Sequence, residues 1–162
     1  MSEEEFKSLD ELINYLASSA VEVSQKSFQV TLNYSPESIK AVEKILGKLH
    51  EDYTKDKSML GINGLAHAFG AYIGEVIRRT EPGVRWERDH ESAGEKSYPL
   101  HWLGGMAFPC GWAYRRIVNG EEDNVWHKYY LLKSGSTKRL LPAREKRFLR
   151  NKNRRRIEEH WS

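Results

Sequence analysis

The sequence predicts an α+β fold: a mainly helical single domain with a small sheet of short strands and a basic C-terminal helix or tail. Three observations predict it. Apolar residues recur at helical spacing in several segments before residue 133. Two short stretches, residues 84–89 and 98–103, instead favour strands. Residues 133–162 hold 11 Lys and Arg against 3 Glu. A length of 162 residues suits one domain, or one domain with a tail.

The N-terminal segment predicts a helix over residues 9–24. Ser8 and Glu11 have the spacing of a capping box, in which each side chain bonds a backbone N–H group at the helix start. The apolar stripe of this helix consists of Leu9, Leu12, Ile13 and Leu16. Residues 28–34 then alternate between apolar and polar side chains, which predicts a short strand.

A second helix is expected to start at Ser35, Pro36 and Glu37. Serine caps a helix, proline suits the first turn, and a carboxylate suits the positive end of the helix dipole. The apolar stripe consists of Ile39, Val42, Ile45, Leu46 and Leu49. Residues 50–58 are charged and polar, which predicts a loop.

The third helix, residues 59–79, is expected to lie at the centre of the domain because apolar side chains cover much of its circumference. Ala66, Gly70 and Gly74 form a row at a spacing of four. Glycine inside a helix costs about 1 kcal/mol relative to alanine. Two glycines in one row therefore predict that another element packs closely against this face.

The second half of the chain predicts two strands, residues 84–89 and 98–103, followed by a turn at Gly104 and Gly105. A short helix is expected within residues 106–119, and Asn119-Gly120 predicts its end. Acidic residues 121–123 predict the start of a further helix. Residues 134–136 resemble a linker, and Pro142 could begin a last helix. The predicted organisation is a globular domain over residues 1–133 and a basic segment over residues 134–162.

Several fragments together resemble a family of uncharacterised bacterial domains. They are Tyr34-Ser35-Pro36-Glu37-Ser38-Ile39, the block at residues 70–79, Gly83 with Trp86, Pro109, and Arg116 followed by residues 119–124. The resemblance covers roughly residues 28–132. It implies a mainly helical α+β domain with a few strands, and it brings no activity with it. The N-terminal helix, Cys110 and the basic tail receive no support from the resemblance.

Composition excludes several classes of protein. The longest nearly uncharged stretch, residues 60–74, is too short for a membrane span. The acidic N-terminus, Met1-Ser2-Glu3-Glu4-Glu5, lacks the positive charge of a secretory signal. A single cysteine, Cys110, excludes an internal disulfide framework. These features favour a cytoplasmic location.

The chain shows no recognised pattern of catalytic or cofactor-binding residues. Cys110 would be a nucleophile if a histidine lowered its pKa, but its neighbours match no cysteine-enzyme signature, and an unpaired cysteine is commonly a buried apolar group. The six histidines have no metal-ligand spacing. No phosphate-binding loop is present. We therefore expect no cofactor, no metal and no catalytic turnover. An enzyme site around Glu75, His101 or Cys110 remains the alternative, because active sites assemble from distant residues.

Glu75 carries the strongest site signal in the domain, because it is the one acid in its helix. An ion pair with Arg78 or Arg79 explains it most simply, since residues three or four apart are neighbours on a helix. The functional alternative is a binding pocket formed by Glu75, Arg79 and Trp86, and flanked by Arg115 or Arg116.

The basic tail is the strongest signal for a partner. Its charge is +8, whereas the first 132 residues carry −5. Phosphate contacts are predicted for Arg147, Arg150, Lys152, Arg154, Arg155 and Arg156. Docking of the tail on the acidic body is the alternative. The predicted function is a non-catalytic binding or accessory protein that contacts another protein, as immunity proteins and antitoxins do; the alternative is a nucleic-acid-associated protein.

Overall fold

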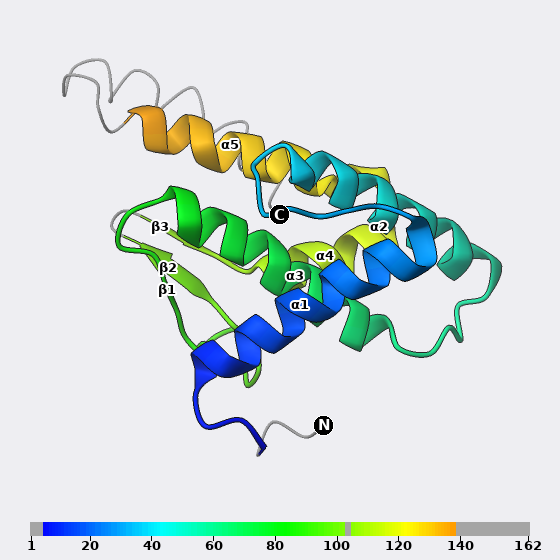
Figure 1. Cartoon of the computed structure of the whole chain (residues 1–162), viewed down its shortest axis with the longest axis horizontal. Coiled ribbons are helices and arrows are strands. Elements are labelled where there is room, and N and C mark those ends of the chain that lie inside the picture. Colours follow the sequence, from blue (N-terminus) through cyan, green and yellow to red (C-terminus); the bar gives the residue numbers. More distant parts are fainter. Residues whose placement is uncertain (1–4, 103–104, 139–162) are drawn as a thin grey trace.

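The computed structural model describes residues 5–102 and 105–138 (Figure 1). The elements in chain order are α1 (Leu9–Phe28), α2 (Ser38–Lys55), α3 (Ile62–Thr80), β1 (Arg85–Trp86), β2 (Leu100–Trp102), β3 (Gly105–Ala107), α4 (Pro109–Asn119), the 3-10 helix η2 (Glu121–Asp123) and α5 (Val125–Lys138). The predicted α+β class, mainly helical with a small sheet of short strands, is confirmed. The basic segment after Lys138 lies outside the described residues.

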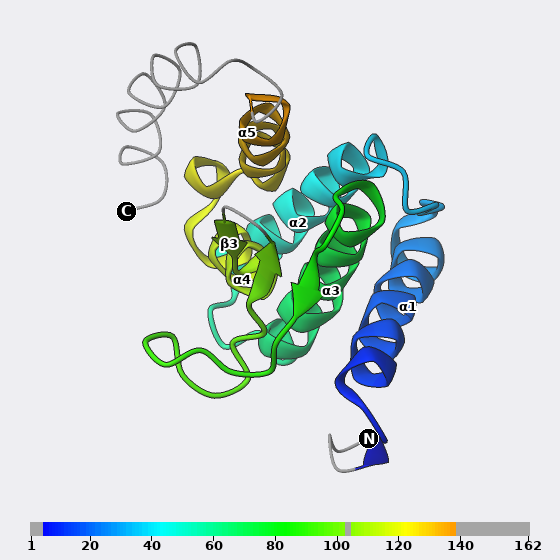
Figure 2. The same ribbon diagram turned by 90° about the vertical axis from the view of Figure 1, so that its left-hand side faces the viewer.

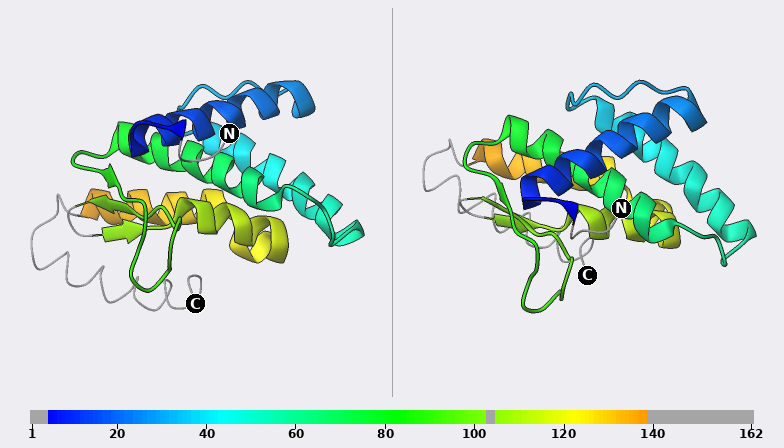
Figure 3. Two further views of the ribbon diagram at one scale, coloured as in Figure 1. Left: turned by 90° about the horizontal axis from the view of Figure 1, so that it is seen from below. Right: turned by 60° about the horizontal axis from the view of Figure 1, so that its bottom comes forward.

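Helix α3 is the centre of the fold, as predicted. It packs between α1 and α4, while α2 packs against α4 and α5. Figures 2 and 3 show α1 and α4 on opposite sides of α3. Residues 68–77 of α3 are all buried, so this helix contributes most of its circumference to the core.

The predicted close approach at the glycine row is confirmed. A Cβ atom added to Gly70 would lie 2.3 Å from Cα of Cys110 at the start of α4. A Cβ atom added to Gly74 would lie 2.1 Å from the ring of Trp86 in β1. Ala66, also buried, continues the row. The two glycines therefore bring α4 and the sheet against the same helix.

The sheet is antiparallel in the order β1-β2-β3. Trp86 stands opposite Leu100, which in turn stands opposite Ala107. The two predicted strands are present but shorter than expected, and β3 begins at Gly105, where a turn was predicted. Between β1 and β2 the chain makes a loop in which His90 and Gly94 bond each other's backbone.

The strand predicted over residues 28–34 is wrong. Helix α1 continues to Phe28, and Gln29 ends it with φ 55°. The following residues cross to α2 as an irregular segment in which Leu32 is buried. The backbone N–H group of Tyr34 donates to Oη of Tyr72 at 2.7 Å, so a side chain on α3 takes the place of a strand partner.

The remaining helices differ from the prediction mainly at their ends. Helix α2 begins at Ser38, whose N–H group donates to Oγ of Ser35, and it extends to Lys55 into the predicted loop. Helix α4 ends before Gly120, as predicted. The acidic residues 121–123 form η2 and not the start of α5. The linker predicted at residues 134–136 is wrong, because α5 continues through them. The helix predicted from Pro142 lies outside the described residues.

Candidate functional site

Glu75 lies in a buried hydrogen-bond cluster at the C-terminal half of α3. Its carboxylate is 2% exposed. Arg78 donates from Nε to Oε1 at 2.8 Å and from Nη2 to Oε2 at 2.7 Å. Trp86 donates from Nε1 to Oε1 at 2.9 Å. The predicted ion pair is therefore present as a two-point contact, and Trp86 joins it from β1.

This environment keeps Glu75 ionised. Burial raises the pKa of the carboxyl, but hydrogen bonds from Arg78 and Trp86, together with the charges of Arg78 and Arg79, outweigh burial and lower the pKa below its ordinary value. A carboxylate with a lowered pKa and three donors is poorly suited to accept a proton from a substrate. The adjoining cavity, which Asp10 and Asn14 of α1 complete, has a volume of only about 120 Å³.

The other two residues predicted to join Glu75 have different partners. The guanidinium carbon of Arg79 lies 3.7 Å from the ring centroid of Tyr34, which is a cation–π contact. Arg116 on α4 is buried, and its Nε donates to Oε1 of Glu43 at 2.6 Å. The structure thus brings Trp86 to Glu75, while Arg116 makes its ion pair with α2.

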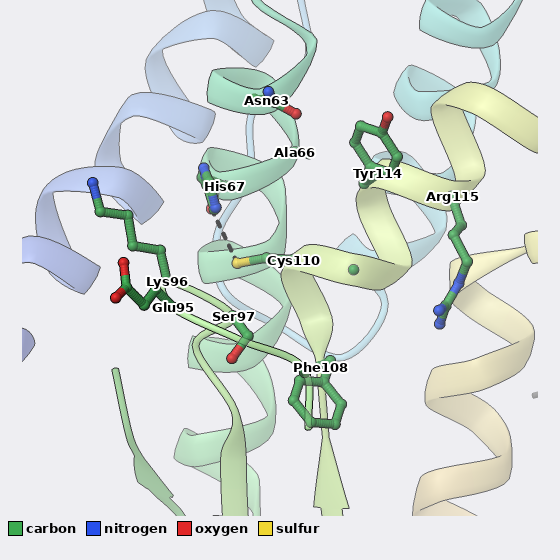
Figure 4. Close-up of a pocket in the computed structure, with 12 residues that line it drawn as sticks. Asn63, Ala66, His67, Glu95, Lys96, Ser97, Phe108, Cys110, Tyr114 and Arg115 are labelled. Atoms are coloured by element: carbon green, nitrogen blue, oxygen red, sulfur yellow. Dashed lines mark hydrogen bonds between the residues drawn. The ribbon is translucent and has the colours of Figure 1, made fainter. Parts of the chain in front are cut away.

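Sequence reasoning missed a larger pocket, which is lined in part by the first half of α4 (Figure 4). Its volume is about 550 Å³. Three segments far apart in the chain surround it: the first half of α3, the loop between β1 and β2, and the β3–α4 junction with the first half of α4. The lining residues are Asn63, Ala66, His67, Ala93, Glu95, Lys96, Ser97, Phe108, Cys110, Gly111, Tyr114 and Arg115.

Backbone geometry positions these walls. The absence of a side chain at Gly70 lets the first turn of α4 approach α3, which places Cys110 beside Ala66 and His67. The loop is held by a bond of 2.8 Å from the N–H group of Lys96 to Oδ1 of Asp89. The Ser97 hydroxyl donates to the carbonyl of Gly94 at 2.8 Å, which closes the same loop.

Two of the residues that line the pocket, His67 and Phe108, each contact a ring outside the lining. His90 meets the ring of Phe108 edge to face, with ring centroids 5.3 Å apart. His67 meets Tyr98 in the same manner at 5.5 Å. Tyr114, by contrast, is 43% exposed, so it presents a ring at the mouth of the pocket. Half-buried aromatic rings in the lining, together with the exposed ring of Tyr114, form an arrangement suited to contact with another molecule.

The chemistry available to Cys110 is restricted. Burial raises the pKa of its thiol to about 12. The Sγ atom lies 3.8 Å from the carbonyl oxygen of His67, which is a weak thiol-to-carbonyl contact and not a contact with an imidazole base. The thiol therefore stays protonated at neutral pH and lacks the activation that a cysteine nucleophile needs.

The other sequence-predicted candidates are dispersed. Nε2 of His101, on β2, lies 3.1 Å from Oε2 of Glu87, and His101 does not line the pocket. Within the described ranges, no three His, Cys, Asp or Glu side chains are grouped as metal ligands. None of the described helices is long and apolar enough to cross a membrane. The six tail residues predicted to bind nucleic acid, between Arg147 and Arg156, lie outside the described residues.

Comparisons with protein-family models, with curated proteins and with solved structures find no match to this chain.

Proposed function

We propose that this chain is a non-catalytic binding protein that contacts a partner protein through the pocket between α3 and α4. The observation that carries the proposal is the pocket itself, with apolar walls, an exposed tyrosine at its mouth and a cysteine held as a thiol. A volume of about 550 Å³ is within the range of ligand-binding pockets and accommodates a few side chains of a protein loop. Immunity proteins and antitoxins are examples of the accessory roles that fit such a domain.

The electrostatic state of Glu75 supports the same choice. An enzyme site near Glu75 would need a carboxylate that can exchange a proton or contact a substrate. Both oxygens of Glu75 instead accept hydrogen bonds from Arg78 or Trp86. We assign Glu75, Arg78 and Trp86 to stabilisation of the α3–β1 contact, and we propose Arg79 and its stacked partner Tyr34 as a secondary contact surface.

A matched pair of tyrosine variants tests the pocket. Tyr114 and Tyr130 are exposed tyrosines on neighbouring helices, at 43% and 58%, but only Tyr114 lines the pocket. Full-length wild-type protein, Tyr114→Ala and Tyr130→Ala are used to capture partners from a lysate of the source cell. A protein retained by wild type and Tyr130→Ala but lost from Tyr114→Ala supports the proposal, once the purified pair shows the same order of affinity.

The opposite pattern would contradict it. Equal capture by wild type and Tyr114→Ala, with both variants melting at the wild-type temperature, would show that the pocket is not the contact surface. If the wild-type protein converts a substrate and Tyr114→Ala abolishes this turnover, the chain is an enzyme.

A second candidate function rests on the charge of the tail. Eleven basic residues against three acidic ones after residue 132 favour an association with nucleic acid through phosphate contacts. The full chain is compared with a variant in which Arg154, Arg155 and Arg156 are changed to Glu, on a nucleic-acid column at low salt. Retention that falls steeply with salt and is lost in the variant supports this candidate. Equal retention of both proteins contradicts it, and a lower melting temperature in the variant would instead favour docking of the tail on the acidic body.

We also propose that this chain is related to the uncharacterised bacterial domains that its sequence resembles. A mainly helical α+β fold is what that resemblance implies. It adds no substrate or partner to the pocket.

A further inference from the structure

Arg115, a charged residue that lines the pocket, is held only loosely by its neighbours. Arg115 is 44% exposed, and its Nε lies 3.6 Å from Oδ1 of Asp123, which is beyond hydrogen-bond distance. Asp123 already accepts a bond of 2.5 Å from Lys128 and one of 2.8 Å from Asn119. The carboxylate of Asp123 is thus satisfied by other donors, and Arg115 is only loosely attached to it.

The local charge balance favours a negative ligand. Lys96 and Arg115 contribute positive charge to the lining, and Glu95 contributes the one negative side chain. Asn63 and Tyr114 add polar donors at the rim, one from each flanking helix (Figure 4). Guanidinium groups bind carboxylates through two parallel hydrogen bonds, which gives Arg115 a specific role in recognising such a group.

The apolar walls set the second requirement. Phe108, which is half-buried, contributes an aromatic ring to the lining, and Ala66 and Cys110 provide small apolar contacts. A segment that carried only charged groups would leave these surfaces uncovered. A segment with an apolar or aromatic side chain next to a carboxylate would satisfy both requirements. The apolar side chain would cover these surfaces, and the carboxylate would contact Arg115.

We infer that the pocket recognises an acidic segment of a partner protein, in which an aromatic side chain enters between α3 and α4 and a flanking carboxylate pairs with Arg115. This inference rests on the proposed function and adds the chemistry of the partner to it. Lys96 supplies long-range attraction for the same segment, and Tyr114 covers the aromatic side chain at the rim.

Short capped peptides test this assignment on the full-length protein. The probes are Ac-Gly-Asp-Phe-Asp-Gly-NH2, its uncharged isostere Ac-Gly-Asn-Phe-Asn-Gly-NH2, and Ac-Gly-Asp-Gly-Asp-Gly-NH2, which has the charges without the ring. Each is titrated into ¹⁵N-labelled protein, and backbone amide shifts are followed. The first peptide should shift amides at residues 63–67, 95–97 and 110–115. Each of the other two should bind about tenfold more weakly, because either the charge-assisted contact with Arg115 or the buried ring is missing.

Arginine variants identify the recognising group. Arg115→Gln should weaken binding of the acidic aromatic peptide about tenfold and bring its affinity to that of the uncharged isostere. The matched control is Arg85→Gln, since Arg85 is an exposed arginine of β1 that does not line the pocket, and it should leave the affinity unchanged.

Three results would overturn the inference. They are equal binding of the acidic peptide and its isostere, an affinity that Arg115→Gln does not alter, and shifts confined to residues 139–162, which would mean that the basic tail attracts the peptide. If the isostere binds as well as the acidic peptide while Tyr114→Ala still abolishes partner capture, the assignment of an acidic segment fails and the binding function stands. If partner capture is also indifferent to Tyr114→Ala, the proposed function itself fails.

Discussion

The indole of Trp86 donates a hydrogen bond of 2.9 Å to the buried carboxylate of Glu75. The same ring fills the space beside Gly74, one residue earlier on α3. A single side chain from β1 thus provides both a polar partner and a packing surface for α3. The position of the sheet on the helix therefore depends on the absence of a side chain at residue 74 and on the charge at residue 75.

Replacement of Gly74 tests the packing half of this relationship. Gly74→Leu should destabilise the fold by about 1–3 kcal/mol, because an added Cβ would lie within 2.2 Å of two ring carbons of Trp86. The measurement is thermal unfolding followed by circular dichroism. Gly64→Ala in the same helix is the control: apart from its chain neighbours and the backbone of its own helix, no atom lies within 4 Å of an added Cβ there, so the melting temperature should stay the same or rise. An unchanged melt for Gly74→Leu would contradict the close contact.

The pH dependence of stability tests the polar half. Glu75 has a lower pKa in the folded chain than its ordinary value of 4.5, so the stability it contributes is present above that pH. This stability is lost as the pH falls through the lower folded-state pKa. Glu75→Gln should be less stable than wild type at pH 7 by about 1–3 kcal/mol, since hydrogen bonds to a charged acceptor are weakened. Its melting temperature should also fall less than that of wild type on acidification.

The control for this series is Glu51→Gln, which changes an exposed carboxylate on α2. Its pH profile should run parallel to that of wild type. A Glu75→Gln profile that also runs parallel to wild type would mean that the Arg78 and Trp86 contacts do not stabilise the ionised carboxylate.

Glu43 holds three helices together. Its Oε1 accepts from Arg116 of α4 at 2.6 Å, and its Oε2 accepts from the backbone of Val125 at the start of α5 at 2.8 Å. Glu43→Ala should destabilise the protein by about 3–5 kcal/mol, because it leaves a buried guanidinium without its counter-ion. Chemical denaturation measures this loss.

An exposed ion pair is the comparison for Glu43. Glu22 and Lys26 form a pair on the surface of α1. Glu22→Ala should leave the denaturation midpoint nearly unchanged, as exposed pairs contribute little. Similar losses for Glu22→Ala and Glu43→Ala would contradict the role of burial in this argument.

Alkylation tests the state of Cys110. Because burial raises the pKa of its thiol from 9.0 to about 12, the thiolate population at pH 8 should be about a thousandfold lower than in the unfolded chain. Iodoacetamide should therefore modify the folded protein very slowly, and the denaturant-unfolded protein at an ordinary rate. Rapid modification of the folded protein at pH 8 would indicate a reactive cysteine and reopen the enzyme alternative.

Local patterns predicted most of the fold because local physics determines it. The capping box at Ser8 and the apolar stripe after it require only neighbours within one or two turns. The glycines of α3 indicated close packing, since a helix interior has little other reason to carry them. Glu75 and Arg78 could be paired from their spacing alone.

Long-range partners explain the errors. The alternation in residues 28–34 was a weak strand signal, and the Tyr34 backbone instead bonds a tyrosine 38 positions away. The partner of Arg116 is Glu43, separated from it by 73 positions. The pocket combines residues from positions 63 to 115, so no local sequence motif predicts it. One signal was available: Gly70 required a close neighbour, and the Pro109-Cys110-Gly111 turn proved to be that neighbour.

Gly70 and Gly74 of α3 also constrain sequence divergence in different ways. At residue 70, an added Cβ meets backbone atoms of Cys110 at 2.3 and 2.5 Å, and no substitution elsewhere can remove backbone. At residue 74, the three atoms nearest to an added Cβ all belong to the side chain of Trp86. Alanine at position 74 is therefore tolerated in a related sequence if the side chain at position 86 is smaller than tryptophan. Among related sequences we expect residue 70 to remain glycine throughout, whereas residues 74 and 86 should covary.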